Sequence, residues 1–441
     1  MSDFQSPPTR VRWKVLALVA FASASAYLTR YCISAANTTI QEDLGFDNAQ
    51  LGRIMSGFAL GYLLFQVPGG WLGNRFGTRW AFACLSLCWS LCSVWSGAAF
   101  ALRNLWASRF ALGVFQAGLT PISAKILSDW IPLKDRGISS AAIGACMSVG
   151  GAFALWFTGW LLARGVGWRP IFHAYSLVGI VWSFAFYWYF RTKPADHAEV
   201  NESELALLRG KEGGDSEDSP KKNDGDHAVS SGLILNMLTS LSMWGICIQS
   251  FFRAAGYVFF VTWFFAFLEY SYGIDKDEAG LLNSLPLIAI VIGSLLGGVI
   301  IDVLLRKTGS KWISRSGTAC VAMIVCAGFT FASTWATTAT QLSVVIAIGA
   351  VFSGIGNPCG WAATIDLGGR NTAVVMGVMN MAGCVAGVTL PVILGSWFDQ
   401  LLETGGDWNQ VIYLHAAFYV LAAVSWLIVD PNRTLDEGEG S

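Results

Sequence analysis

Three arginines, Arg30, Arg109 and Arg253, lie deep inside long apolar stretches of the sequence. A charged side chain at the centre of a bilayer costs roughly 2.5 to 3.5 kcal/mol on insertion scales unless it faces water or a partner. The sequence places no Asp or Glu at comparable depth, so these cations have no evident internal counter-ion. A guanidinium stays protonated, and its planar fork matches a carboxylate or a phosphate. The pattern therefore predicts a binding site for a small organic anion.

Two of these arginines have a tyrosine on the same helical face. Tyr27 precedes Arg30 by three residues, and Tyr257 follows Arg253 by four. Residues at these spacings are neighbours on a helix. A tyrosine hydroxyl beside an arginine suits a hydroxylated acid, so all four residues are predicted to contact substrate.

Arg109 and Gln116 share another face, two turns apart. Gln116 is either a ligand for substrate hydroxyls or a polar residue between packed helices. Arg109 lies nearest a membrane interface. For this residue, extension to the membrane surface or bonding to backbone carbonyls is as well supported as a role in the site.

The segment Asn357–Trp361 contains both Pro and Gly, which is typical of an interrupted helix that exposes backbone groups to a cavity. Trp361 is predicted to form one apolar wall of that cavity. Ordinary packing of the ring is the competing interpretation.

Membrane-spanning helices are predicted to position these residues. The chain has 441 residues, of which 54% are hydrophobic and 13% charged. Crossing a hydrocarbon core of roughly 30 Å takes about 20 apolar residues, and twelve such runs exclude a water-soluble globular protein. The predicted helices are 14–38, 51–73, 79–100, 103–128, 138–163 and 168–190, then 236–268, 278–303, 314–335, 341–365, 371–398 and 409–429.

This arrangement predicts an all-α membrane protein with 12 transmembrane helices in two pseudo-symmetric six-helix bundles. The expected N-terminal bundle is 1–190, followed by a cytoplasmic linker at 191–235, a C-terminal bundle at 236–430 and a cytoplasmic tail at 431–441. The halves resemble each other at 70–75 and 298–302, and at the glycine-containing faces 144–150 and 377–383. Repeats of this kind are typical of transporters that alternate access between two sides.

The charges predict the orientation. Lys and Arg gather at one set of helix ends and in the linker: Arg75, Arg79, Lys134, Arg136, Arg306, Lys307, Lys311, Arg315 and Arg370. By the positive-inside rule this side, with both termini, is cytoplasmic in an inner or plasma membrane. The opposite loops are acidic and include Glu42, Glu269 and Asp399. The charged stretch 191–231 is expected to be solvated and partly disordered, without a core of its own.

Other chemistry is not predicted. The net charge of −1 gives no basic excess for nucleic acid, and the ten cysteines lie in apolar runs rather than in a disulfide framework. None of the four histidines has a metal-ligand neighbour, and no nucleophilic triad is visible. We therefore expect no metal, no cofactor and no enzymatic activity. The expected partners of a monomer are an anionic substrate, a coupling ion if transport is coupled, and lipid.

The run GWLGNRFGTR from Gly70 to Arg79 resembles the signature of the major facilitator superfamily between its second and third helices. The resemblance implies a conformational role for Gly70, Arg75, Gly77 and Arg79. The acidic position of the signature is Asn74 here. The counterpart in the second half keeps its acid as Asp302.

Further segments resemble the anion:cation symporter family within that superfamily. They are YLTR at Tyr27, LGRIMSGFALGYLLFQVPGGWL from Leu51, RFALGVFQAG from Arg109 and GVMNMAG from Gly377. The family includes carriers of aldonates, hexuronates and glucarate, and the vesicular glutamate and sialic acid carriers. It implies symport of a carboxylated substrate.

By position, the resemblance assigns the cavity lining to Tyr27, Arg30, Tyr62, Arg253, Trp361 and Asn380, and coupling and gating to Arg109. Many members of the family have proton-carrying carboxylates where this chain has Thr29 and Gln116. Neither residue titrates in the physiological range, so the usual proton route is expected to be absent. Coupling to sodium, exchange against another anion and uniport all stay open. A carrier of aromatic acids and a sensor that has lost transport are the alternative functions.

Overall fold

The computed structural model describes residues 7–132, 135–209, 231–369 and 372–435. Eleven helices in these ranges are long and apolar enough to cross a membrane, and α3 (Asn48–Phe76), with 29 residues, is a further long helix of the bundle. The prediction of an all-α protein with 12 transmembrane helices is confirmed.

The N-terminal bundle contains α1, α3, α4, the consecutive pair α5 and α6, α7 and α8. Their bounds are α1 Val11–Ala35, α3 Asn48–Phe76, α4 Thr78–Gly97, α5 Leu102–Gln116, α6 Leu119–Trp130, α7 Arg136–Ala163 and α8 Trp168–Tyr189. A short helix, α2 (Asn37–Leu44), connects α1 to α3. The predicted span 103–128 is therefore two helices in sequence, with a break at Ala117 and Gly118.

The C-terminal bundle repeats this plan. Its helices are α10 Ser231–Thr239, α11 Leu241–Thr262, α12 Phe264–Tyr272, α13 Lys276–Thr308, α14 Thr318–Ala332, α15 Ala339–Gly368, α16 Thr372–Thr404 and α17 Asn409–Leu427. A π-helical turn, Ile313–Gly317, leads into α14. The predicted span 236–268 is divided among α10, α11 and α12.

The expected interruption at Asn357–Trp361 is wrong, because Pro358 lies inside the continuous helix α15. A proline removes a single backbone donor, and a membrane helix tolerates this loss when packed neighbours and small local adjustments satisfy the freed carbonyl. Pro68, Pro286 and Pro391 likewise lie within α3, α13 and α16.

Short polar sequences begin several helices. The Asp47 carboxylate accepts a hydrogen bond from the Gln50 backbone at 2.6 Å, and the Gln50 side chain accepts one from the Asp47 backbone at 3.2 Å. This capping box satisfies donors at the start of α3 that the helix itself leaves unpaired. Asp275 caps α13 by accepting from the Glu278 backbone at 2.9 Å.

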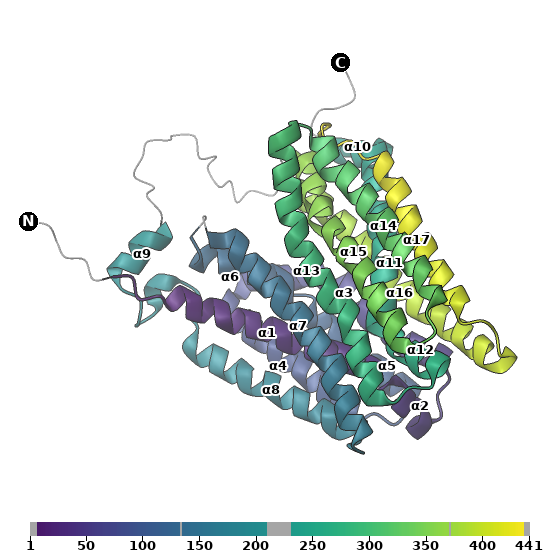
Figure 1. Ribbon diagram of the computed structural model, residues 1–441. Coiled ribbons are helices and arrows are strands. Elements are labelled where there is room, and N and C mark those ends of the chain that lie inside the picture. The colour runs from purple at the N-terminus through teal and green to yellow at the C-terminus, as the bar shows by residue number, and fades with distance from the viewer. Residues whose placement is uncertain (1–6, 133–134, 210–230, 370–371, 436–441) are drawn as a thin grey trace, which may run out of the picture.

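The two bundles pack together from one end of the molecule inward, where α3 lies against α16 and α7 lies against α13, and they separate toward the other end (Figure 1). Both bundles contribute to the apolar cluster at this end, which includes Leu51, Leu155, Trp263 and Phe264. From this junction, near α2 and α12, the bundles diverge toward the end that carries both termini, α9 (Glu202–Arg209) and α10.

The first part of the charged segment after α8 is ordered, in contrast to the expectation of a solvated linker. The side chain of Glu204 in α9 is fully buried and accepts hydrogen bonds from the Val11 and Arg12 backbones, each at 3.1 Å. Glu204 thus caps α1 from a distant part of the chain and pairs with the Arg12 side chain. These bonds hold the pKa of Glu204 below its ordinary value despite burial. Residues 210–230 lie outside the described ranges.

Candidate substrate site

Arg30 lies in an aromatic cage. Its guanidinium carbon is 4.3, 4.6 and 5.0 Å from the ring centroids of Tyr27, Phe58 and Tyr62, respectively. Such geometry is a cation–π arrangement, which holds a cation in place without neutralising it. Only 9% of the residue is exposed, and within the described ranges its buried Nη2 atom has no hydrogen-bond partner. The cage therefore surrounds a charged donor that no described protein group accepts from.

Glycines bring the cage together. A Cβ atom added to Gly113 of α5 would lie 2.1 Å from the carbonyl oxygen of Phe58, and one added to Gly61 of α3 would lie 2.2 Å from that of Phe110. Only residues without a Cβ allow the two helices to approach this closely. The crossing places Phe58 and Tyr62 of α3 over Arg30 of α1.

Arg109 supports the backbone of α1 beside the cage. It is 2% exposed and donates from Nη1 to the carbonyl of Thr29 at 3.0 Å and from Nη2 to the carbonyl of Arg30 at 2.6 Å. Of the interpretations that the sequence left open, bonding to backbone carbonyls is the observed one. Arg109 thus positions Arg30 through its main chain.

Gln116 is fully buried and uses both ends of its amide. Its Oε1 accepts from Nε of Arg30 at 3.1 Å, while its Nε2 donates to the carbonyl of Ala26 at 3.0 Å and to Oγ1 of Thr29 at 3.1 Å. The amide therefore connects Arg30 to α1 as a packed, polar residue. Thr29 is also fully buried, and its hydroxyl donates to the Ala26 carbonyl at 2.9 Å.

Arg253 and Tyr257 lie one turn apart on α11, and Tyr257 reaches the first bundle. The Tyr257 hydroxyl lies 3.1 Å from that of Tyr31, and the Tyr31 ring packs edge-on against Tyr27 with centroids 5.5 Å apart. Arg253 is partly buried, and within the described ranges its Nε atom has no hydrogen-bond partner. A continuous set of tyrosines thus runs from the Arg30 cage to the second bundle. Tyr31 was not predicted, although it follows Tyr27 by one helical turn.

A second polar link crosses between the bundles at Asn380 of α16. Its Nδ2 donates to Oε1 of Gln66 on α3 at 2.9 Å. Gln66 lies one turn after Tyr62, whose hydroxyl is 3.4 Å from that of Thr120. Asn380 was predicted, whereas Gln66 was missed; its position one helical turn from Tyr62 was the available signal.

Trp361 does not contact the cage. It lies on α15 with 53% of its surface exposed. Its predicted place in a cavity wall stays a prediction. In the described parts of the chain, the ion pairs include no Asp or Glu paired with Arg30, Arg109 or Arg253.

The family comparison agrees with this architecture. The sequence model described as "Major Facilitator Superfamily" matches residues 19–391 and 246–440. The chain belongs to the Major Facilitator Superfamily. Its members are transporters, so the expectation of a transporter rather than an enzyme is confirmed, as is the multi-pass membrane location.

Several relatives within the Major Facilitator Superfamily match nearly the whole chain. A "probable galactarate/D-glucarate transporter GudP" of Pseudomonas putida is 30% identical over 96% of this chain and 92% of its own. The "probable sulfoacetate transporter SauU" of Cupriavidus necator is 26% identical over 97% of this chain and 96% of its own length. A "D-galactonate transporter" of Escherichia coli O6:H1 is 25% identical over 96% of each.

Solved structures of other proteins share the fold. A bacterial homologue of the human lysosomal transporter Spinster, in an inward-facing and unoccupied conformation, superposes with a TM-score of 0.70 at 17% identity, covering 95% of each chain. A D-xylose–proton symporter superposes with a TM-score of 0.68 at 15% sequence identity. The superposition covers 95% of this chain and 98% of the symporter chain. Such identities establish the fold alone.

The residues of the Major Facilitator Superfamily signature lie at the end of α3 that is remote from the bundle junction. Gly77 joins α3 to α4 with φ of 81°, a conformation that favours glycine. Arg79 donates to the carbonyl of Tyr187 at 2.8 Å, whereas Arg75 is exposed. Gly70 faces Pro121 of α6. The side chain of Asn74 lies outside what the structure describes.

In the second half, two cations near the corresponding turn pair with an acid that lies outside the motif. Asp302 is exposed, whereas Asp366 of α15 lies 3.2 Å from both Nζ of Lys311 and Nε of Arg315. This three-residue cluster binds α15 to the start of the π-helical turn. The acid that pairs with these cations comes from a different helix, which the motif does not reveal.

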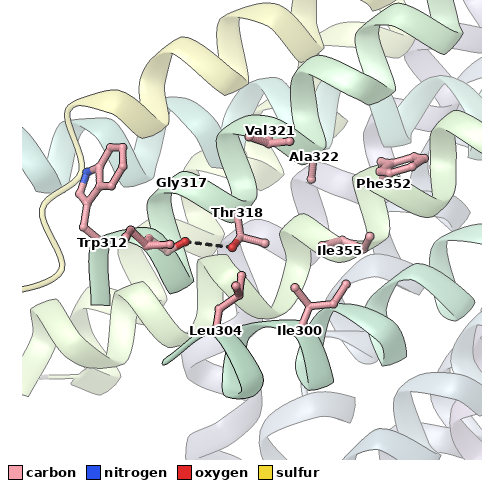
Figure 2. A pocket seen from close by; sticks show the side chains of 10 residues that line it. Ile300, Leu304, Trp312, Gly317, Thr318, Val321, Ala322, Phe352 and Ile355 are labelled. Atoms are coloured by element: carbon pink, nitrogen blue, oxygen red, sulfur yellow. Dashed lines mark hydrogen bonds between the residues drawn. The ribbon is translucent and has the colours of Figure 1, made fainter. Parts of the chain in front are cut away.

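An apolar pocket of about 420 Å³ lies outside the candidate site (Figure 2). It is formed by α13, the π-helical turn, α14 and α15, and its labelled lining residues include Leu304, Trp312, Val321 and Phe352. The hydroxyl of the lining residue Thr318 donates to the Ile313 carbonyl at 2.9 Å. With no charged lining residue, this pocket does not fit a small organic anion.

Proposed function

We propose that the protein carries a small organic anion, in the first place a sugar acid, by alternating access of its two bundles. The observation that supports this most directly is the caged Arg30 with its unfilled Nη2 donor. Relatives named as galactarate/D-glucarate and D-galactonate transporters add support, because those substrates are polyhydroxylated carboxylates.

In this proposal the substrate carboxylate accepts hydrogen bonds from the Arg30 guanidinium. The rings of Tyr27, Phe58 and Tyr62 hold the guanidinium in one orientation, so little rotamer freedom is lost on binding. Arg253, Tyr257 and Trp361 contribute from the second bundle. Arg109 acts indirectly, since its donors are used on the backbone of α1.

The substrate hydroxyls then contact Gln66 and Asn380. These amides bond to each other at the site where α3 approaches α16. Each amide has both donors and acceptors, as a hydroxyl does. A polyhydroxylated acid can therefore replace the amide–amide bond with equivalent bonds to itself, and in doing so contact both bundles.

We also propose how the protein is oriented in the membrane and to which side its two bundles are open. The termini, the linker and the divergent end of the bundles face the cytoplasm of a cell membrane, in keeping with the Lys and Arg distribution. In that orientation the closed junction near α2 and α12 is the external face, and the molecule is open to the inside. The division into bundles at 1–190 and 236–430, with a linker between them, is part of the same proposal.

Transport is proposed to proceed without the usual proton carriers. The Gln116 amide donates to a carbonyl and a hydroxyl while it accepts from Arg30, so it acts as a permanently neutral counterpart of a protonated Glu. Neither Gln116 nor Thr29 can release a proton near neutral pH. The protein then works as a facilitator or an exchanger around this site.

A second candidate substrate is a small sulfonate. One relative is named as a sulfoacetate transporter, and a sulfonate offers acceptor oxygens that an arginine fork can bind. The cross-bundle amides favour the hydroxylated acid, because a small sulfonate has fewer groups to satisfy them.

The test uses purified protein in liposomes and labelled glucarate, galactonate, glucuronate and sulfoacetate. We expect saturable uptake of at least one sugar acid, and no accumulation of that acid against its own gradient when a proton gradient is imposed. Arg30→Ala should lower the uptake rate more than tenfold. Arg306→Ala, which removes an exposed cation at the end of α13, is the matched control and should retain uptake. Uptake of sulfoacetate alone would favour the second candidate, and wild-type uptake by Arg30→Ala would contradict the site.

A further inference from the structure

A carboxylate lies within the closed junction between the bundles. Glu269 of α12 accepts a hydrogen bond at its Oε2 from the hydroxyl of Thr38 on α2, at 2.8 Å. The two residues belong to different halves of the chain, so the bond can exist only while the junction is closed. In the sequence, Glu269 has the appearance of an ordinary acid of an external loop.

The charges around Glu269 do not neutralise it. Lys276, at the start of α13, donates to Thr39 at 2.8 Å and pairs with Glu42 at 3.7 Å. Glu42 of α2 is itself a nearby negative charge and is 73% exposed. The last turn of α1 adds no charged residue.

Two other acids near this junction have basic partners of their own. Asp43 of α2 accepts from Arg169 and Trp168, and these bonds hold its pKa below the ordinary value. Asp277 of α13 pairs with Arg164 of α7 at 3.7 Å. Burial raises the pKa of Glu269 to about 7, and the nearby Lys276 only partly opposes this effect.

We propose that Glu269 is a proton-binding site whose occupancy controls the opening of the closed face. A protonated Glu269 can stay between α2 and α12 as a neutral, hydrogen-bonded group. A deprotonated Glu269 is a partly buried charge, which becomes fully hydrated when the bundles separate. The proposal rests on the proposed alternating-access function and adds its regulation.

The direction of the pH dependence follows from linkage. The carboxyl binds its proton more tightly in the closed state than in an open state, where exposure returns it to its ordinary value of 4.5. The proton therefore stabilises the closed face fully below pH 4.5, and this stabilisation is lost as the pH rises to about 7. One pKa unit corresponds to a tenfold change, so the difference of about 2.5 units should make opening up to about three hundredfold more favourable across this window.

This site differs from a coupling site in the substrate cavity. Glu269 lies at the junction and opens to one side of the membrane only, so its proton does not cross with the substrate. Equal pH on both sides should therefore still change the transport rate, whereas an imposed proton gradient should not drive accumulation. This difference separates the proposal from proton symport.

The direct test measures the junction without any substrate. Spin labels are attached at Arg103→Cys on α5 and Glu403→Cys on α16, which are exposed residues at the closed end of different bundles, after the partly exposed native cysteines are replaced with serine. Their distance distribution is recorded in lipid nanodiscs from pH 4.5 to 8. We expect the population of long distances to grow with pH, and to stay small and constant in Glu269→Gln.

Two further variants complete the test. Glu42→Gln removes the exposed neighbouring acid and should keep the pH dependence, while Thr38→Val removes a hydrogen bond to the charged form and should move the midpoint to higher pH. Glu269→Gln with the pH response of the wild type would overturn the proposal, as would a wild type without any response. The spin-label measurement needs no substrate, so it is independent of the transport proposal. If only the transport proposal fails, the junction will still respond to pH, but none of the anions will be taken up.

Discussion

Arg30 is held by groups that leave its charge available. Rings surround the guanidinium, an amide binds its Nε, and a neighbouring arginine binds the carbonyl of the same residue. In water such an arginine would be hydrated, and here the substrate can take the place of that water. The fixed orientation lowers the entropy cost of binding a carboxylate.

Gln116→Glu should make substrate binding take up protons. A carboxylate at this position would pair with the Arg30 Nε that the amide oxygen now binds, and an arriving anion would then compete with it. Binding should therefore favour protonation of the introduced acid. Calorimetry in buffers of different ionisation enthalpy measures this uptake, which should be near zero in the wild type and approach one proton per substrate in the variant at neutral pH. Gln116→Met, which cannot titrate, should show none; equal uptake in both variants would contradict the role given to the amide.

At the scale of elements, the site depends on the close crossing of α3 and α5. Neither Phe58 nor Tyr62 is on the helix of Arg30, and both reach it because Gly61 and Gly113 let the backbones nearly touch. The same glycines would be unremarkable in a sequence with 48 of them. Gly61 and Gly113 matter because the backbone of the partner helix lies directly against each of them.

Gly113→Ala should separate these helices and weaken the cage. The added Cβ would lie 2.1 Å from the Phe58 carbonyl, which is backbone and cannot turn away. Overpacking of this kind costs about 1 to 3 kcal/mol, so we expect a lower melting temperature and weaker anion binding. Gly144→Ala, where the added Cβ meets no atom within 4 Å, is the control and should leave both quantities near the wild-type values. Unchanged binding by Gly113→Ala would show that the crossing does not support the site.

For the whole molecule, the closed face is maintained by bonds between the bundles that must break during transport. Asp399 of α16 accepts from the Asn48 and Ala49 backbones at 2.9 and 2.8 Å, and from Asn48 Nδ2 at 2.8 Å. A carboxylate of one bundle therefore caps the first turn of α3 in the other. Hydrogen bonds and helix-terminus charge both contribute to this contact.

Asp399→Asn should weaken the closed face by about 1 to 2 kcal/mol, because the charged acceptor of three donors becomes neutral. The same pair of spin labels at pH 8, where Glu269 is deprotonated, should show more of the long-distance population than the wild type. Asp407→Asn, which changes an exposed acid after α16, should not. A distance distribution unaffected by Asp399→Asn would exclude Asp399 from the closing contacts.

The sequence alone determined the class of protein, and it predicts the charge of the candidate site. Twelve apolar runs predict the membrane helices because span length depends only on local composition. Buried cations predict an anion site because their cost is independent of the fold. The predicted positions of the helix breaks were less accurate. Pro358 does not interrupt α15, and the fourth predicted span is divided at Ala117 and Gly118, where there is no proline.

Only the tertiary structure decided which residues meet across helices and bundles. Tyr31 joins Tyr257 over 226 residues, Gln66 joins Asn380 over 314, and Glu269 joins Thr38 over 231. Helical spacing relates neighbours on one helix and cannot state which face a distant helix covers. Glu269 is partly buried, and its bond to Thr38 joins α12 to α2 of the other bundle, so the acid that appeared to be a solvated loop residue is instead part of the junction. The physical reason is that desolvation and hydrogen bonding depend on the whole local environment, which forms only when both bundles are folded together.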